Sequence, residues 1–112
     1  MDTAAGFVDI ASVAEIPPGH AARTEIDGRP VAVFNLEGTY YALDDTCSHA
    51  EASLSDGDLD VRNCAIECPL HGSAFDLRTG EPLTLPAVEP VGVHRVEVSD
   101  GVVRVALSPE PL

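Results

Sequence analysis

Two short stretches of the sequence each place one cysteine and one histidine close together. Cys47 and His49 form the first pair, Cys68 and His71 form the second, and eighteen residues separate His49 from Cys68. Thiolate and imidazole are the side chains that bind soft and borderline transition metals most strongly. No other part of the chain offers four such ligands so compactly. We therefore predict a metal centre bound by Cys47, His49, Cys68 and His71.

The donor set by itself fits two kinds of metal centre. One is a structural zinc ion with two cysteines and two histidines in a tetrahedron. The other is a [2Fe-2S] cluster in which two histidines replace two cysteines on one iron. Zinc fingers usually supply their cysteines from one end and their histidines from the other, whereas here each pair contains one of each. Two such loops can place both thiolates on one iron and both imidazoles on the other, so the order favours a two-iron centre.

The segments that must position these pairs have the patterns of short β-strands. Strands are expected at residues 7–11, 21–26, 31–34, 39–43, 64–67, 72–77, 91–98 and 102–107. Asp-Gly or Glu-Gly turns follow three of them, while residues 53–58 read as a polar turn and 82–90 as a proline-rich extended connection. We predict an all-β fold, a small antiparallel sandwich or barrel, with residues of about 44–86 forming a two-loop insertion that binds the metal. The chain, 1–112, is expected to be a single domain.

Composition and charge limit the classes of partner. Nineteen acidic and six basic residues give a net charge of −13, which repels nucleic acid and anionic membranes and attracts a basic docking patch. Acidic side chains such as Asp56, Asp58 and Asp60 lie near the metal-binding stretch, where they either steer such a partner or simply keep the surface solvated. With no basic, apolar start and no membrane span, the protein is expected in the cytoplasm. An odd number of cysteines, three, argues against a disulfide framework.

The pattern Cys47-x-His49 followed by Cys68-Pro69-Leu70-His71-Gly72-Ser73, with Phe75-Asp76 and Thr79-Gly80 behind it, resembles the Rieske ferredoxins. The resemblance is closest to the soluble ferredoxin components of bacterial ring-hydroxylating dioxygenases, including actinobacterial ones, and it extends over the whole chain. It implies one [2Fe-2S] cluster, with both cysteines on the inner iron and both histidines on the outer iron. Neutral imidazoles make the cluster less negative, so Rieske potentials run from about −150 to +300 mV, against about −400 mV for plant-type ferredoxins.

Two departures from the respiratory members of that family are informative. Those members have a disulfide between the two cluster loops, but the matching positions here are Glu51 and Leu70. They also direct a serine and a tyrosine hydroxyl at the cluster; this chain keeps the serine, Ser73, and has Phe75 in place of the tyrosine. Because hydrogen bonds to sulfur favour the reduced state, we expect a low-to-intermediate potential.

Other residues have simpler interpretations. Cys64, four residues before Cys68, is interpreted as a buried structural thiol in a strand rather than as a ligand. His20 and His94 are interpreted as surface histidines. Of the adjacent Tyr40 and Tyr41, one is expected to pack inward. By the same resemblance, a proline loop containing Pro86 is expected to lie against the cluster.

No nucleophile–base pair, phosphate-binding loop or substrate pocket is evident. An oxygenase needs a second iron site, usually two histidines and a carboxylate, and beyond His71 only His94 remains. The resemblance therefore implies an electron carrier and not an enzyme, a monomer that passes electrons from a flavin-dependent ferredoxin reductase to a terminal oxygenase. An accessory protein of iron–sulfur cluster assembly and a zinc-stabilised interaction module without a redox role are the alternatives.

Overall fold

The computed structural model describes residues 6–48, 52–70, 72–85 and 87–108. These residues form an almost purely β structure with two single-turn 3-10 helices, η2 (Val13–Glu15) and η3 (Leu54–Asp56). The described strands are β1 (Val8–Ser12), β2 (Ala21–Ile26), β3 (Arg29–Leu36), β4 (Thr39–Asp44), β5 (Asp58–Asp60), β6 (Ala65–Glu67), β7 (Ala74–Asp76), β8 (Val93–Ser99) and β9 (Val102–Ala106). The predicted all-β class is confirmed.

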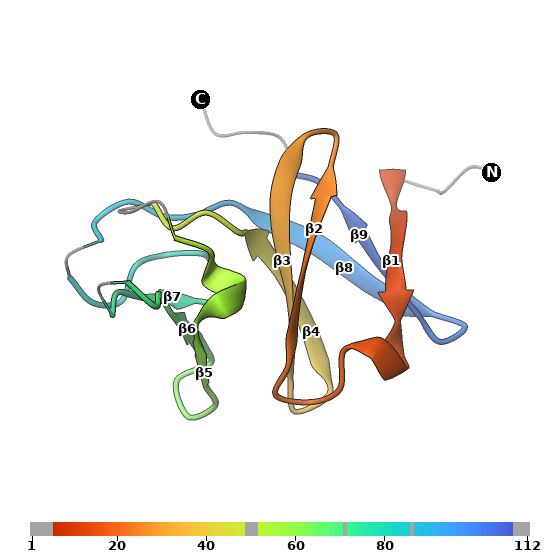
Figure 1. The fold of residues 1–112 in the computed structure, drawn as a ribbon, viewed down its shortest axis with the longest axis horizontal. Coiled ribbons are helices and arrows are strands. Elements are labelled where there is room, and N and C mark those ends of the chain that lie inside the picture. The colour runs from red at the N-terminus through yellow and green to blue at the C-terminus, as the bar shows by residue number, and fades with distance from the viewer. Residues whose placement is uncertain (1–5, 49–51, 71, 86, 109–112) are drawn as a thin grey trace.

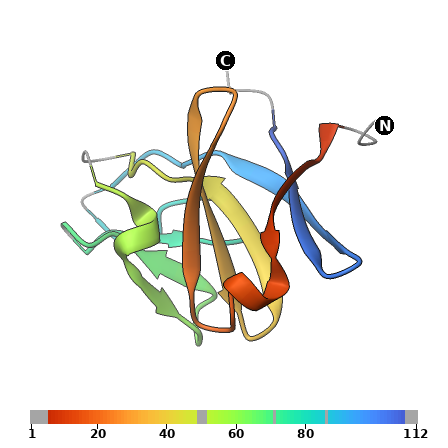
Figure 2. The same ribbon diagram turned by 45° about the vertical axis from the view of Figure 1, so that its right-hand side comes forward.

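Six strands make one antiparallel sheet in the order β1-β9-β8-β4-β3-β2, which curves into a nearly closed barrel (Figures 1 and 2). The predicted meander β2-β3-β4 and the final hairpin β8-β9 are confirmed. Asp27, Glu37 and Asp100 have φ near +53° and each precedes a glycine with positive φ. Two successive residues with positive φ are what a two-residue type I′ hairpin turn requires, so these dipeptides set the strand register.

Two cores lie on opposite faces of the β2-β3-β4 meander. The barrel core consists of Ile16, Ile26, Val31, Val33, Ala42, Val103 and Val105. The loop-side core consists of Ala32, Phe34, Leu36, Leu43, Cys47, Leu54, Ile66, Cys68, Phe75, Leu77, Ala87 and Val91. Strand β3 supplies alternate residues to both, because successive side chains point to opposite faces of a strand. Tyr40 packs against the barrel core and Tyr41 against the loop-side core, so each tyrosine packs inward, where one was expected to do so.

A second sheet, β5-β6-β7, is inserted between β4 and β8, at the lower left of Figure 1. Its central residues Leu59, Ile66 and Phe75 are cross-strand neighbours, and Ile66 and Phe75 are fully buried. Strand β5 was not predicted. The sequence indicated only a polar turn at residues 53–58, and β5 begins at the last residue of that turn, Asp58. Pairing with β6 overrides the low strand propensity of its two aspartates. No helix within the described ranges is long and apolar enough to cross a membrane.

Candidate metal centre

Loop 1 (residues 47–52) follows β4 and is closed at its base by main-chain contacts. The amide of Cys47 donates a hydrogen bond to the carbonyl of Ala52 at 3.0 Å, and Thr46 and Ser53 form an isolated antiparallel bridge beside it. The chain then enters η3, whose Leu54 is buried in the loop-side core. Cys47 therefore lies at the fixed base of a short closed loop. The predicted ligand His49 lies outside the described residues.

Loop 2 (residues 68–73) connects β6 to β7 and is closed in the same way. The amide of Cys68 donates to the carbonyl of Ser73 at 2.7 Å, so in both loops the cysteine amide is bonded to the carbonyl five residues later. A further bond from the amide of Gly72 to the carbonyl of Cys68, at 3.0 Å, tightens loop 2. The predicted ligand His71 lies outside the described residues. The two predicted cysteine ligands thus occupy equivalent positions in two similarly closed loops.

The side chains of Cys47 and Cys68 both enter the loop-side core, where they are 4% and 1% exposed. Neither forms a disulfide. The other two predicted ligands lie outside the described residues, so the structure places only the two cysteines, both in the loop-side core. Within the described part, no group of three metal-binding side chains converges.

Cys64 is not the buried strand residue that we expected. It is half-buried in the turn before β6, with φ of +53°, and its main-chain carbonyl accepts a hydrogen bond from the amide of Leu77. Its side chain packs against the loop-side core and forms a hydrogen bond with Tyr41. That bond, followed by burial, raises the pKa of Tyr41. The turn needed to reverse the chain between β5 and β6 explains why Cys64 lies outside the strand.

A strap of residues 80–92 precedes β8 and contacts both loops. It is closed at a neck, where the amide of Val91 donates to the carbonyl of Gly80 at 2.9 Å. Along the strap, the amide of Ala87 donates to the hydroxyl of Ser73 at 3.1 Å, and the hydroxyl of Ser48 donates to the carbonyl of Glu89 at 2.6 Å. The strap is therefore bonded to loop 1 and to loop 2. Pro86 of the expected proline loop lies outside the described residues.

We expect replacement of Ser73 by alanine to lower the midpoint potential of the metal centre. Ser73 is fully buried, its carbonyl accepts the amide of Cys68, and its hydroxyl accepts the amide of Ala87, so we expect the hydroxyl to donate its own proton to a sulfur of the centre. A lost donor disfavours the more negative reduced state. The unpaired Ala87 amide should also reduce the free energy of unfolding by about 1–3 kcal/mol. Potentiometric titration and urea unfolding measure the two effects.

Thr84→Val is the control for this prediction, because Thr84 lies on the same strap and its hydroxyl accepts the amide of Ala74 in β7. It removes a comparable hydrogen bond without removing a hydroxyl from the buried core. An equal change of potential in both variants would contradict a specific role for Ser73.

A profile of the Rieske [2Fe-2S] domain matches residues 6–100. This chain belongs to the Rieske [2Fe-2S] domain family. A Rieske cluster takes up and gives up one electron, and it requires two thiolates and two imidazoles. The donor chemistry of this Rieske domain fits that requirement: two cysteines that form no disulfide are buried at the bases of two closed loops, and each loop sequence contains one histidine.

Named relatives and solved structures agree with the family. The chain is 42% identical over 101 residues to the 3-phenylpropionate/cinnamic acid dioxygenase ferredoxin subunit of Photorhabdus laumondii, covering 90% of this chain and 94% of that subunit. The ferredoxin of carbazole 1,9a-dioxygenase from Nocardioides aromaticivorans superimposes with a TM-score of 0.87 at 38% identity, covering 92% and 99% of the two chains. A chain from a complex of reduced oxygenase and oxidised ferredoxin in carbazole 1,9a-dioxygenase gives a TM-score of 0.85 at 39% identity, covering 95% and 99%.

The structure describes two histidines, His20 and His94, and both belong to segments outside the two cluster loops. His20 is exposed, as expected, and its main-chain carbonyl accepts a hydrogen bond from the amide of Asn35 in β3. His94, expected at the surface, is 4% exposed, and both of its ring nitrogens are hydrogen-bonded. The expectation for His94 was wrong, because its partners are distant in the sequence and no local pattern reveals them.

Asp45, two residues before Cys47, is a site residue that sequence reasoning missed. It is 1% exposed, and its carboxylate accepts hydrogen bonds from Arg23 and from the amide of Ser55, each at 3.0 Å. Burial alone would raise the pKa of Asp45, but hydrogen bonds from Ser55, Ser53 and Arg23 together lower it. The carboxylate is therefore held charged beneath loop 1, where it ties β2 to the segment entering η3.

Asp45→Asn should destabilise the Rieske domain at pH 7 by about 1–3 kcal/mol, less than for a fully buried ion pair because Arg23 is half-exposed. A lowered folded-state pKa means that Asp45 contributes stability above the unfolded value of about 3.9, and that this stability is lost as pH falls through the folded pKa. The difference between the wild type and Asp45→Asn should therefore close on acidification. Urea unfolding at a series of pH values between neutral and 3 checks this, and a constant difference would contradict it.

Proposed function

We propose that this Rieske domain is a one-electron carrier that takes electrons from a flavin-dependent ferredoxin reductase and delivers them to the terminal oxygenase of a ring-hydroxylating dioxygenase. The observation that carries the proposal is the match over nearly the full length of chains named as dioxygenase ferredoxins, one of them in a complex with its oxygenase. The chain would act in the cytoplasm, as a monomer, with residues 1–112 as one domain and residues of about 44–86 binding the cluster. Catalysis would belong to the oxygenase.

Cys47 and Cys68 would supply thiolates to the inner iron, and His49 and His71 would supply imidazoles to the outer iron. The burial of both cysteines in the loop-side core supports this assignment, because a thiolate pair inside the protein leaves the histidines as the ligands nearer the surface. The described histidines support it too, since His94 has both ring nitrogens bonded within the protein.

The side chains around the loops indicate which surface meets a partner. Leu70 in loop 2 and Leu83, Leu85 and Val88 on the strap are 48–77% exposed. Next to them, the outer face of β5-β6-β7 forms a shallow depression of about 570 Å³, whose lining includes Asp60, Glu67 and Leu85. Exposed apolar side chains beside carboxylates fit a partner surface that is apolar at its centre and basic at its edge.

Leu85→Asp should slow electron delivery to an oxygenase by tenfold or more, because it places a charge where apolar contact is expected. Val98→Asp is the matched control, since Val98 is 49% exposed on β8, outside the loops and the strap. Stopped-flow oxidation of the reduced protein by the terminal oxygenase of N. aromaticivorans carbazole 1,9a-dioxygenase measures the rate. Equal rates for the two variants would exclude this surface.

The function itself is tested by metal content, spectroscopy and turnover. The purified protein should contain two irons per chain, and its reduced form should give an electron paramagnetic resonance signal with the low average g of a Rieske centre. With the carbazole dioxygenase reductase and oxygenase, it should support substrate oxidation in place of the native ferredoxin. Zinc without iron would overturn the proposal. A Rieske signal without reduction by any dioxygenase reductase would favour a role in iron–sulfur cluster assembly.

A further inference from the structure

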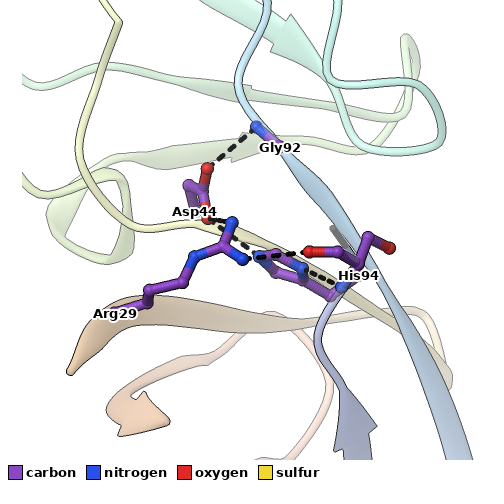
Figure 3. A network of polar contacts seen from close by, with 5 residues as sticks. Arg29, Asp44, Gly92 and His94 are labelled. Carbon is purple, nitrogen blue, oxygen red and sulfur yellow. Dashed lines mark hydrogen bonds and ion pairs between the residues drawn. The ribbon is translucent and has the colours of Figure 1, made fainter. Parts of the chain in front are cut away.

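A partly buried network of one ion pair and several hydrogen bonds joins four separate segments around Asp44 (Figure 3). Asp44, the last residue of β4, accepts hydrogen bonds through Oδ1 from His94 Nε2 at 2.8 Å and from Arg29 Nη2 at 3.1 Å. Its Oδ2 accepts the amide of Gly92 at 3.1 Å. The main chain of Ser108 completes the network, because its amide donates to His94 Nδ1 at 3.0 Å and its carbonyl accepts Arg29 Nη1 at 2.9 Å.

The network fixes the tautomer of His94. The amide of Ser108 can only donate, so Nδ1 must be the acceptor, and the proton of the neutral ring lies on Nε2. Nε2 then donates to Asp44. The His94 side chain is fully buried, and both of its ring nitrogens are hydrogen-bonded. Its bond to Asp44 is the shortest hydrogen bond that the Asp44 carboxylate accepts in this network.

Asp44 connects the beginning of loop 1 to the end of the strap. Asp44 lies three residues before Cys47, and its amide donates to the carbonyl of Gly92 at 2.9 Å while its carboxylate accepts the Gly92 amide. Gly92 leaves no room for a side chain, since a Cβ there would lie 2.6 Å from Asp44 Oδ2. The carboxylate therefore occupies the space that any other residue at position 92 would fill.

We propose that Asp44, held by His94, is a positioning residue for the metal centre: it fixes the distance between the base of loop 1 and the end of the strap, and so sets the environment of Cys47. This inference rests on the proposed electron-carrier function and adds to it. Loop 1 has its own closing bond, from Cys47 to Ala52, but that bond does not connect the loop to the barrel. The Asp44 network makes such a connection, to β3, to β8 and to the segment after β9.

Two substitutions of His94 separate its two hydrogen bonds. In His94→Gln, the terminal amide nitrogen can take the place of Nε2 and donate to Asp44, while the amide of Ser108 loses its acceptor. In His94→Asn, the shorter amide can accept from Ser108 in the place of Nδ1, while Asp44 loses its donor. Each variant loses the imidazole and one hydrogen bond, so the pair is matched in its general effect on stability.

The first measurement is amide hydrogen exchange of the iron-loaded protein, read separately for residues 44–48, for 88–92 and for β9. We expect His94→Asn to raise exchange at least tenfold in the first two segments and not in β9, and His94→Gln to raise it only around Ser108. Gly92→Ala, which displaces the Asp44 carboxylate directly, should reproduce the His94→Asn pattern. Equal patterns in the two His94 variants, or a uniform rise through the barrel, would overturn the proposal.

The second measurement is the midpoint potential. An Asp44 carboxylate with one fewer donor is less neutralised and disfavours the more negative reduced state, so His94→Asn should lower the ratio of reduced to oxidised protein at a fixed potential threefold or more. His94→Gln and the control Asp9→Asn, which breaks an exposed ion pair with Arg104, should leave it within twofold. An unchanged ratio in His94→Asn, with two irons bound, would overturn the positioning role and leave the electron-carrier function standing. Wild-type protein without iron would instead overturn the function.

Discussion

Cys68→Ser should yield a protein without iron and without visible absorbance. Cys68 is 1% exposed, and its amide closes loop 2 through Ser73, so the thiol lies inside the protein at the base of that loop. A serine hydroxyl is a hard, weakly acidic ligand that does not replace a thiolate on iron of a cluster. Because four protein side chains would hold the cluster, with Cys68 as one of only two thiolates, loss of this thiolate should release the whole cluster. Iron and sulfide analysis with the visible spectrum measures the result.

Cys64→Ser is the matched control for that substitution, four residues earlier in the same chain. Its thiol contacts Tyr41 and lies in a turn, and it is not one of the predicted ligands. The variant should keep two irons per chain and an unchanged Rieske signal. If Cys64→Ser lost its cluster and Cys68→Ser kept it, the ligand assignment would be wrong.

Gly80→Ala should have the largest effect on stability, because two penalties act at one position. Gly80 has φ of +77°, in the left-handed region that costs an L-residue about 1–2 kcal/mol. A Cβ there would also lie 2.1 Å from the carbonyl oxygen of Val91 and 2.9 Å from Val93 Cγ2, so the neck of the strap must open. Forced backbone shifts of this kind cost about 1–3 kcal/mol, which gives a total loss of about 2–5 kcal/mol.

Gly101→Ala isolates the first of these penalties. Gly101 has φ of +76°, and a Cβ there would meet nothing within 4 Å, so it should cost only about 1–2 kcal/mol. Urea unfolding followed by far-ultraviolet circular dichroism compares the two variants. Gly80→Ala should also lose iron faster to a chelator, because the strap is bonded to Ser73 and Ser48 in the two loops. Equal unfolding free energies for the two variants would show that the neck accommodates a methyl group.

The features that could be predicted from the sequence are those encoded locally. Asp27-Gly28 and Asp100-Gly101 define hairpin turns by the backbone conformation they allow, so the barrel strands follow from them. The apolar run from Val31 to Phe34 signals a strand buried on both faces, and β3 is such a strand. The spacing of cysteine and histidine likewise predicts the four ligands of the metal centre without any knowledge of the fold.

The features that could not be predicted depend on contacts between distant residues. His94 meets Asp44 across fifty positions, and Asp45 meets Arg23 across twenty-two, so neither pair leaves a periodic signal. Strand β5 carries one apolar residue, Leu59, between two aspartates, and it forms because β6 provides a partner edge. The polar residues that support the loops were missed for this reason, whereas the proposed ligands themselves were evident.

The division of the molecule into two cores has a consequence for the order in which the chain folds and for its resistance to proteolysis. The barrel core contains no cysteine and closes without any predicted ligand, whereas the loop-side core includes both Cys47 and Cys68. The free energy of local unfolding differs between separate cores of one protein. We therefore expect the newly made chain to form its barrel core first, and the loop-side core to pack fully only when the cluster is inserted. Loss of the cluster would then expose Leu54, Phe75 and their neighbours to proteases. The lifetime of the protein in the cell would therefore follow the supply of iron.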